Sequence, residues 1–423
     1  MNEQNKNQII SVIDIGTTKI IALIADYDLD ENKINKIIGF GESESNGLQS
    51  GVVVNIKDTI KSITKAVEAA EEQTDGIQMT EVFVGISGNH IKGMNYSGVA
   101  PINSSNNIQA IGHSIDKDDI DRVLEHAKSI NCPPDRRIMH VLPQQYIVDN
   151  QEGIKEPLGL SGHRLEAKVH LVTSSKNTET DIETCLKEIG INIIEFILEP
   201  LASSYSVLSK DERELGSILI DIGGGTTDII TYGNGSVLHT GVIPIGGTII
   251  TKDIAYRVQT SIEQAEKLKH VYGKAKIDLS NDEDNIVVKG IGGRNEYKIS
   301  SKVLSEVIEP RLQEIFEFVK EEIEKSDFKG DYTFGIVLTG GGSKLSGITN
   351  MVHDIFKIPV KVGSPIYDFE IIDLDIEISD PRYATSIGLI KYAGEHFEDY
   401  QEIKEKSIFE TLKNFFKKII NNK

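Results

Sequence analysis

The stretch DIGTTK at residues 14–19 recurs as DIGGGTTD at residues 221–228, lengthened by two glycines. Each copy follows one apolar run and precedes another, which predicts a strand, a tight turn and a second strand. Glycine lets the backbone turn its N–H groups towards an anion, and threonine hydroxyls add further donors. An aspartate beside a phosphate needs a divalent cation between them. The first turn (14–19) and the second turn (221–228) therefore predict two half-sites that close on one magnesium-bound nucleotide.

For either turn alone, the alternative is an ordinary glycine-rich hairpin. Two copies 207 residues apart (221 minus 14), each with Asp before Gly and a Thr pair after it, favour phosphate binding. Neither turn ends in Gly-Lys-Ser/Thr, and a strand rather than a helix follows each. These features exclude a Walker loop and a dinucleotide-binding fingerprint.

Length and composition limit the class of protein. The 423 residues suffice for two to four domains or subdomains, and 39% apolar with 26% charged residues is typical of a soluble globular protein. The net charge of -20 makes nucleic acid a poor partner. Cys132 and Cys185 lack metal-ligand spacing, so neither a disulfide nor a zinc site is expected. The polar N-terminus and the lack of a long apolar run predict a cytoplasmic location.

Five features in chain order resemble the actin, Hsp70 and sugar-kinase superfamily. They are the turn at Asp14, a connecting helix from Glu199, the turn at Asp221, a glycine cluster at Gly340 and a second connecting helix from Tyr383. The superfamily implies two α/β domains of related topology, hinged by the connecting helices. It also implies Mg-ATP in the cleft between the domains.

Within this superfamily the chain resembles the FtsA family of bacterial division proteins over nearly its whole length. The segments that carry this resemblance are VGISGNHI (84–91), HVLPQQY (140–146), QEGI (151–154), LGLSG (158–162), AKVHL (167–171), LASSYSVL (201–208) and VIEPR (307–311). An insertion rich in Gly, Asn, Ser and Pro stands where FtsA carries its own subdomain, unlike actin, MreB and Hsp70. We therefore expect an actin-like two-domain α/β ATPase fold with an inserted FtsA-type subdomain and a C-terminal amphipathic helix.

The expected domain organisation follows the composition and the resemblance. The segments are a first actin-like domain at 1–87 and 167–198, an inserted subdomain at 88–166, a second actin-like domain at 199–248 and 331–394, a peripheral lobe at 249–330, a highly charged linker or solvated helix at 395–406 and an amphipathic helix at 407–423.

Residue roles at the nucleotide follow from the chemistry and from the resemblance. Asp14 and Asp221 are expected to hold Mg through water. The two turns are expected to bind the β and γ phosphates through Gly16, Thr17, Thr18, Lys19, Gly223, Gly224, Gly225, Thr226 and Thr227. The adenosine is expected beside a helix N-terminus at Gly340, Gly341, Gly342 and Ser343. Glu199 stands where hydrolysing relatives orient the attacking water, which permits weak ATPase activity at most.

Two further sets of residues each have competing interpretations. Glu266 and Lys269 lie three apart on one helix face and suit contacts to ribose and adenine, but a solvated ion pair explains them as well. Four scattered histidines lack i,i+4 pairs, so we expect core or surface roles rather than a metal site; they are His90, His140, His163 and His170.

The segment SIFETLKNFFKKII at 407–420 has the pattern of an amphipathic helix. Its apolar residues share one face and are Ile408, Phe409, Leu412, Phe415, Phe416, Ile419 and Ile420. Its polar surface carries Lys413, Lys417 and Lys418. This composition predicts binding to an anionic membrane surface. The alternative is that the helix docks on the protein's own core.

The resemblance implies an ATP-binding, polymer-forming peripheral protein that tethers the FtsZ ring to the cytoplasmic face of the cell membrane at the septum. The FtsZ C-terminal tail is expected on the peripheral lobe, and other divisome proteins on the inserted subdomain. Cations on or beside the lobe suit an acidic peptide, although solvated surface charge is the alternative; they are Arg294, Lys298, Lys302 and Arg311. The rival function is a soluble catalytic ATPase or small-molecule kinase of the same fold. The amphipathic segment and the lack of an acceptor-substrate signature argue against it.

Overall fold

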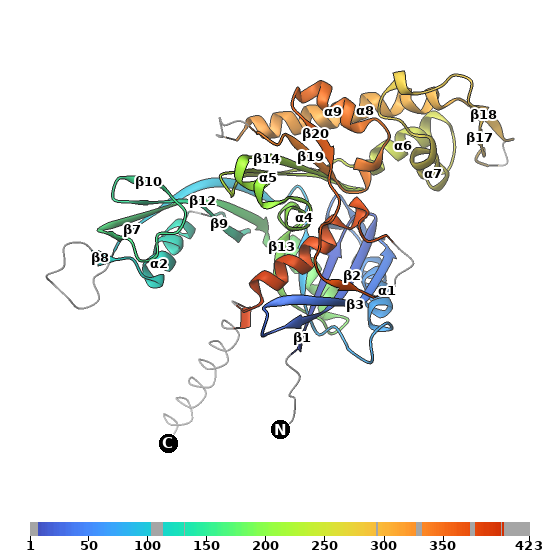
Figure 1. The fold of residues 1–423 in the computed structure, drawn as a ribbon. Coiled ribbons are helices and arrows are strands. Elements are labelled where there is room, and N and C mark those ends of the chain that lie inside the picture. The colour runs from blue at the N-terminus through green and yellow to red at the C-terminus, as the bar shows by residue number, and fades with distance from the viewer. Residues whose placement is uncertain are drawn as a thin grey trace.

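The computed structural model describes residues 7–102, 113–130, 132–292, 295–326, 332–372, 377–398 and 400–401. Two sheet-based domains form the body of the molecule, with an inserted subdomain on one side and a lobe on the other (Figure 1). The chain therefore has the two-domain architecture that the superfamily resemblance implies.

The first domain is built on a six-stranded sheet in the order β13-β6-β1-β2-β3-β21. Its strands are β1 (Asn7–Ile15), β2 (Lys19–Asp28), β3 (Lys33–Glu44), β6 (Glu81–Ile86), β13 (Asn192–Leu198) and β21 (Glu370–Ile371). The first three form an antiparallel meander that contains the predicted strand, turn and strand, and β6 runs parallel to β1. β2 is almost wholly buried, which explains its unbroken apolar run. Its helices are α1 (Ile56–Glu71), capped by Asn55, and α3 (Lys176–Lys187); a short hairpin, β4 (Leu48–Gln49) and β5 (Val52–Val53), precedes α1.

The second domain repeats this topology in a five-stranded sheet in the order β16-β15-β14-β19-β20. Its strands are β14 (Ser217–Ile222), β15 (Thr227–Gly233), β16 (Ser236–Ile243), β19 (Ile336–Thr339) and β20 (Val360–Val362). β14, β15 and β16 form a meander, and β19 runs parallel to β14 as β6 does to β1. Its helices are α4 (Glu199–Val207), α5 (Lys210–Leu215) and α9 (Ile348–Phe356). The first and second turns therefore occupy equivalent positions in two related sheets.

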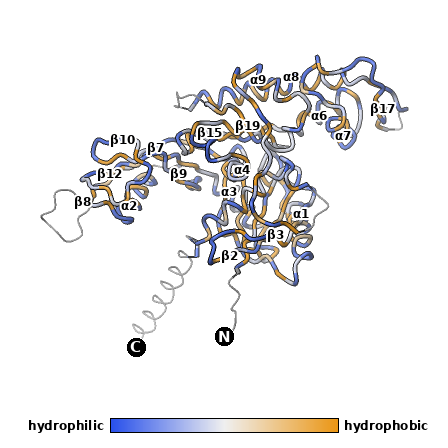
Figure 2. Tube along the Cα trace, in the orientation of Figure 1, coloured by the Kyte–Doolittle hydropathy of each residue, from blue (hydrophilic) through white to orange (hydrophobic). Residues whose placement is uncertain are grey.

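The lobe continues the hydrophobic core of the second domain. It contains α6 (Gly247–Arg257), α7 (Ile262–Tyr272), the 3-10 turn η1 (Ile277–Leu279), the hairpin β17 (Ile286–Val288) and β18 (Tyr297–Ile299), and the start of α8 (Ser301–Glu324). Figure 2 shows hydrophobic residues gathered in the strands of both domains and in the helices that face them.

The inserted subdomain has its own sheet, in the order β10-β9-β12-β7, and its own core. Its elements are β7 (Lys92–Pro101), β8 (His113–Ser114), α2 (Lys117–Lys128), β9 (Arg136–Val148), β10 (Gln151–Ile154), β11 (Ser161–Gly162) and β12 (Arg164–Ser175). A capping box at Asp116 begins α2. β12 continues through the predicted boundary at residue 166, because it pairs with β7 and β9 along its length.

The second connecting helix spans 384–398 and follows the 3-10 turn η3 (Pro381–Tyr383). It crosses α4 so closely that a Cβ at Gly388 would lie 1.8 Å from the Ala202 carbonyl oxygen. Residues 395–398 continue this helix, as one of the two alternatives for 395–406 expected, but Phe397 is buried and packs on Tyr27 with ring centroids 4.9 Å apart. The predicted amphipathic helix at 407–423 lies outside the described residues.

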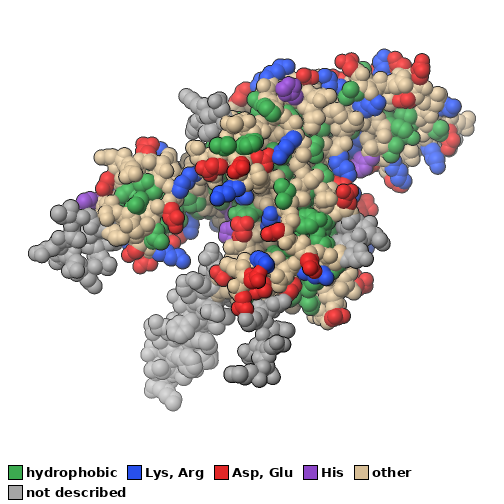
Figure 3. Space-filling model, in the orientation of Figure 1, with side chains coloured by type: hydrophobic (Ala, Val, Ile, Leu, Met, Phe, Trp, Pro, Cys, Tyr) green, Lys and Arg blue, Asp and Glu red, His purple; other side chains and the backbone are tan. Residues whose placement is uncertain are grey.

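Within the described ranges, no helix combines the length and the apolar character needed to cross a bilayer. On the face drawn in Figure 3, Lys and Arg side chains lie among Asp and Glu side chains across the body, the inserted subdomain and the lobe. On this face, charges of both signs are therefore mixed rather than gathered in one domain.

Candidate functional site

The first and second turns meet at the interface between the two domains. A Cβ at Gly224 would lie 2.2 Å from the Thr18 methyl carbon, and a Cβ at Gly225 would lie 2.4 Å from the Thr17 hydroxyl oxygen. These close approaches explain two of the three glycines of the second turn, Gly224 and Gly225. The turns touch in this structure, so phosphates would enter between them only if they separated.

Three buried aspartates, Asp14, Asp221 and Asp228, and the partly buried Glu199 form a carboxylate cluster behind the turns. Burial raises the pKa of Asp14 to about 6 against the attraction of Lys19, and it raises the pKa of Asp228 to about 7. Burial and the other three carboxylates hold the pKa of Glu199 well above its ordinary value. Because these charges repel one another in a poorly solvated site, the cluster favours binding of a cation.

The ammonium group of Lys19 places a positive charge beside the carboxylate cluster. Its ammonium donates to the Arg382 carbonyl and lies 4.4 Å from the ring centroid of Tyr383. Burial lowers the pKa of Lys19, while the attraction of Asp14 opposes the shift. The Tyr383 hydroxyl in turn donates to Glu42 at 2.9 Å. Lys19 is therefore held between the first turn and the start of the second connecting helix.

Asp221 joins both connecting helices. Ser203 of α4 donates to its carboxylate at 2.7 Å, and Thr385 of the second connecting helix donates at 3.2 Å. Gly340 packs on the same carboxylate with φ of 78°, and a Cβ there would lie 2.2 Å from Asp221 Oδ1. A side chain at residue 340 would therefore both clash and strain the backbone.

The sequence predicts that the glycine cluster opens directly into a helix, but no α-helix begins there. Gly341–Lys344 form the 3-10 turn η2, and α9 begins only at Ile348. Gly342 packs against Ile222, where a Cβ would lie 2.4 Å from its Cγ2. The predicted helix N-terminus at Gly340–Ser343 is wrong, although these residues do pack beside Asp221 and the second turn.

Glu266 and Lys269 form an ion pair 2.8 Å apart, but it is not the solvated pair of the alternative interpretation, because only 12% of the Lys269 side chain is exposed. Lys269 also donates to the Gly247 carbonyl at 3.0 Å, and the Gly247 N–H donates to Gly223 of the second turn at 2.9 Å. Partial burial would raise the pKa of Glu266, but hydrogen bonding from His270 and the charge of Lys269 outweigh it and the pKa is about 2. The ion pair therefore anchors α7 beside the second turn.

Sequence reasoning gave no role to Asp228, Ser87, Ser203 or Thr385. Asp228 had a signal, because it closes the second turn at the position where Lys19 closes the first. The three hydroxyl residues had none, since their partners are distant in sequence.

Among the described residues, no group of three His, Cys, Asp or Glu side chains is arranged to ligate a metal directly. The carboxylate cluster consists of the hard oxygen donors that suit Mg²⁺ held through water. The metal alternative for the histidines has no such group to support it: His90, His140 and His170 are buried, and His163 is exposed.

The cations predicted to receive a partner peptide are spread over the lobe and α8. Lys302 pairs with Asp282 at 2.9 Å, and Arg311 pairs with Asp253 at 2.7 Å. Lys298 lies exposed on β18, and Arg294 lies outside the described residues.

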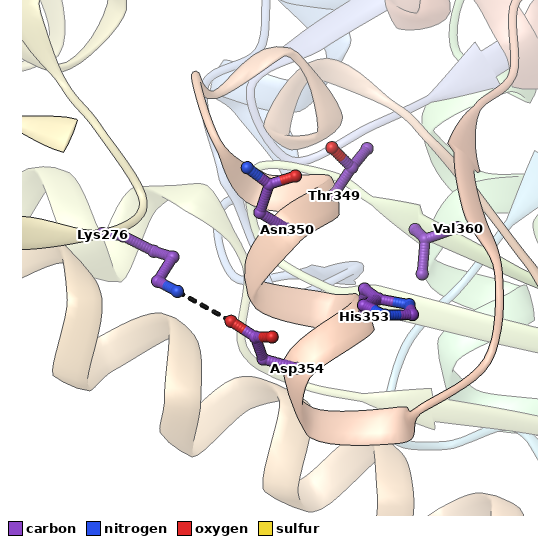
Figure 4. Close-up of a pocket in the computed structure, with 6 residues that line it drawn as sticks. All are labelled: Lys276, Thr349, Asn350, His353, Asp354 and Val360. Atoms are coloured by element: carbon purple, nitrogen blue, oxygen red, sulfur yellow. Dashed lines mark hydrogen bonds and ion pairs between the residues drawn. The ribbon is translucent and has the colours of Figure 1, made fainter. Parts of the chain in front are cut away.

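A separate cavity of about 390 Å³ lies beside α9 (Figure 4). Its lining residues are Lys276, Thr349, Asn350, His353, Asp354 and Val360. Lys276 and Asp354 form an ion pair across it at 2.7 Å. This cavity contains none of the predicted site residues. It is therefore not part of the candidate nucleotide site, whatever its size.

Comparisons with known proteins match both the second domain and the inserted subdomain. The profile of the family described as "Cell division protein FtsA" matches residues 218–388, and that of the "SHS2 domain inserted in FTSA" matches residues 88–173. Cell division protein FtsA of Pseudomonas aeruginosa is 41% identical over 392 residues, which cover 93% of this chain and 91% of the relative. The protein of that name from Neisseria meningitidis is 43% identical over 391 residues, covering 92% and 91%.

Solved structures show the fold at low sequence identity. The PilM-PilN type IV pilus biogenesis complex matches with a TM-score of 0.63 at 16% identity, covering 91% of this chain and 98% of that chain. MreB5 of Spiroplasma citri bound to ADP matches with a TM-score of 0.54 at 16% identity, covering 96% and 99%. The MamK double helical filament matches with a TM-score of 0.51 at 12% identity, covering 91% and 98%. The chain thus has the actin-like fold expected from its sequence.

Proposed function

Since this chain belongs to the FtsA family of cell division proteins, we propose that it binds Mg-ATP between its two domains, assembles into filaments and tethers the FtsZ ring to the membrane. It would act as a peripheral protein on the cytoplasmic face of the cell membrane at the septum. The observation that carries this proposal is the convergence of two matching turns on one buried carboxylate cluster.

The nucleotide site is the part of the proposal that the geometry supports best. Asp14 and Asp221 would hold Mg²⁺ through water, and N–H groups of the two turns would bind phosphates. When bound, the ion would neutralise phosphate charge that the carboxylates otherwise repel. A fold neighbour, MreB5, was solved with ADP. Isothermal titration with ATP, with Mg²⁺ and with EDTA, tests the site; no heat of binding in Mg²⁺ would reject it.

Self-assembly is proposed from the family and from a fold neighbour that was solved as a double helical filament. Electron microscopy of the full chain with ATP and with ADP tests it. Single particles under both conditions at high protein concentration would count against a polymer.

The membrane tether is proposed for residues 407–423. Burying one large apolar side chain contributes about 1.5 to 3 kcal/mol, less at an interface where burial is partial. One lysine near an anionic surface contributes about 1 kcal/mol. Apolar burial should therefore outweigh charge attraction in this segment.

Co-sedimentation with anionic liposomes tests the tether. Phe415→Glu with Phe416→Glu should abolish binding at any salt, whereas Lys417→Gln with Lys418→Gln should weaken it mainly at low salt. Liposome binding by the phenylalanine variant, or its complete loss in the lysine variant, would contradict this balance. A full chain that never pellets with liposomes would favour the rival soluble ATPase or kinase.

FtsZ binding is proposed for the lobe, with other divisome proteins on the inserted subdomain. The lobe exposes apolar side chains beside cations: Tyr256 is 89% exposed, next to the exposed Arg257. Such a surface suits a peptide with both acidic and apolar residues. Fluorescence anisotropy with an FtsZ tail peptide should show weaker binding to Arg294→Glu with Lys302→Glu. Lys65→Glu, at an exposed site on α1, is the control, and equal affinity of both variants would move the site elsewhere.

A further inference from the structure

A buried hydrogen bond crosses from the first domain to the second beside the carboxylate cluster. The Ser87 hydroxyl, directly after β6, donates to Asp228 Oδ1 of β15 at 2.5 Å. Both residues are only 3% exposed. A hydroxyl bound to a carboxylate in such a site is among the stronger kinds of hydrogen bond, because water does not compete for either group.

Asp228 faces the same site as Asp221. The two residues are directly paired in the antiparallel β14–β15 ladder, so their side chains project from the same face of the sheet. The second oxygen of Asp228 accepts from Thr226 of the second turn at 3.2 Å. The hydroxyl of Ser87 therefore helps to fix the orientation of a carboxylate that also contacts the second turn.

Ser87 is also the residue at which the chain leaves the first domain for the inserted subdomain. The loop that follows it is fastened to the base of that subdomain, because Arg136 donates to the carbonyls of His90 and Thr173, each at 2.8 Å. Arg136 begins β9 and Thr173 lies near the end of β12. The loop at 87–91 therefore connects the second turn to the base of the inserted subdomain.

A second contact between the inserted subdomain and the second domain lies farther along β16. His170 bridges Asn95 at 2.7 Å and Thr240 at 2.8 Å, and Gln144 donates to the Val237 carbonyl at 2.9 Å. The inserted subdomain is thus held to the second domain at one point beside the second turn and at another along β16. Movement of the second turn must break the Ser87–Asp228 bond or displace the loop at 87–91.

We infer that the Ser87–Asp228 hydrogen bond is a latch: Ser87 is a positioning residue for Asp228, and the bond couples the second turn to the inserted subdomain. Its coupling to nucleotide rests on the nucleotide binding proposed above. Occupancy of the turns would then change how firmly the inserted subdomain is held.

Hydrogen–deuterium exchange on the full-length protein without nucleotide tests the latch directly. Ser87→Ala should speed exchange in β7 and β16 by up to about tenfold, while Ser87→Thr, which keeps the hydroxyl, should restore slow exchange. Ser97→Ala, at an exposed site on β7, is the matched control. Unchanged exchange in Ser87→Ala overturns the latch, whether or not the protein binds ATP.

Titration with Mg-ATP tests the coupling. Ser87→Ala should weaken ATP binding by about tenfold, and a cycle with Asp228→Ala should be non-additive, because both changes remove the same bond. ATP should slow exchange in β7 of the wild type but not of Ser87→Ala. A persistent effect of ATP in Ser87→Ala overturns the coupling. Failure of the wild type to bind ATP instead rejects the proposed nucleotide site, and the nucleotide-free exchange still decides the latch.

Discussion

Replacing Asp228 by asparagine should stabilise the nucleotide-free protein, and increasingly so as the pH rises. The pKa of Asp228 is about 7 in the folded chain because of burial, against an ordinary value of 3.8. Below pH 3.8 the carboxyl is neutral in both the folded and the unfolded chain, so it does not lower the free energy of unfolding. Between 3.8 and 7 the unfolded chain releases a proton that the folded chain retains, so the free energy of unfolding falls as the pH rises. Above pH 7 the carboxyl is ionised in both states, and the free energy of unfolding falls no further on its account.

The expected size follows from these two pKa values. Their difference corresponds to at most about 4 kcal/mol, and the carboxylate cluster shares its protons, so about 2 to 4 kcal/mol is expected at pH 8. Asparagine keeps an oxygen that can accept from Ser87 and carries no charge at any pH. The variant should therefore match the wild type near pH 4 and exceed it at pH 8.

Urea denaturation from pH 4 to pH 8 measures this difference. Circular dichroism suits the assay because the chain contains no tryptophan. Buried histidines such as His140, whose pKa is lowered to about 3 by burial, add stability as the pH rises, but they do so equally in both proteins. Asp211→Asn, an exposed site on α5, removes the same charge without touching the cluster. A difference between variant and wild type that stays constant across this pH range would refute the reasoning.

Three further substitutions probe the same site. Asp221→Ala should lower ATP affinity in Mg²⁺ by at least about 100-fold, measured by isothermal titration, and unchanged affinity would remove Asp221 from the metal site. Gly340→Ala should cost about 1 to 3 kcal/mol in urea denaturation, because its Cβ meets Asp221 at a φ of 78°; wild-type stability would contradict the clash. Glu199→Gln should leave ATP affinity within a few-fold but lower any phosphate release by about 100-fold, and equal turnover would deny Glu199 its role.

The paired topology could be predicted from sequence because its signals are local. Each turn lies between two apolar runs, and these runs form the paired strands β1 and β2 and the paired strands β14 and β15. The turns also identified Asp14 and Asp221, which the structure brings into one buried cluster. Local patterns thus gave the sheets and the acidic centre of the site.

The contacts across the domain interface could not be predicted in this way. Ser87 and Asp228 are 141 residues apart, and Thr385 and Asp221 are 164 apart. Hydroxyl residues of this kind occur throughout the chain, and only the packing of whole domains selects their partners.

Two expectations failed for reasons of local chemistry. The glycines after Gly340 have poor helix propensity, so a 3-10 turn forms there and α9 starts later. The charged residues from Glu395 onwards suggested a linker or a solvated helix, but Ala393, Phe397 and Tyr400 keep the helical spacing of a face that packs on the first domain. The high charge of this segment drew attention away from the helical spacing of its apolar residues.

The crossing of the two connecting helices at Gly388 gives the helix at 384–398 the mechanics of a lever. With the fulcrum at Gly388, the short arm reaches Thr385, about 4.5 Å away along the axis, and the long arm reaches residue 398, about 15 Å away. A shift of roughly 1 Å where Thr385 holds Asp221 becomes about 3 Å at the far end. The chain continues from residue 398 to the amphipathic sequence at 407–423. A small displacement at the carboxylate cluster would therefore be larger at the residue where the chain leaves the body towards that sequence.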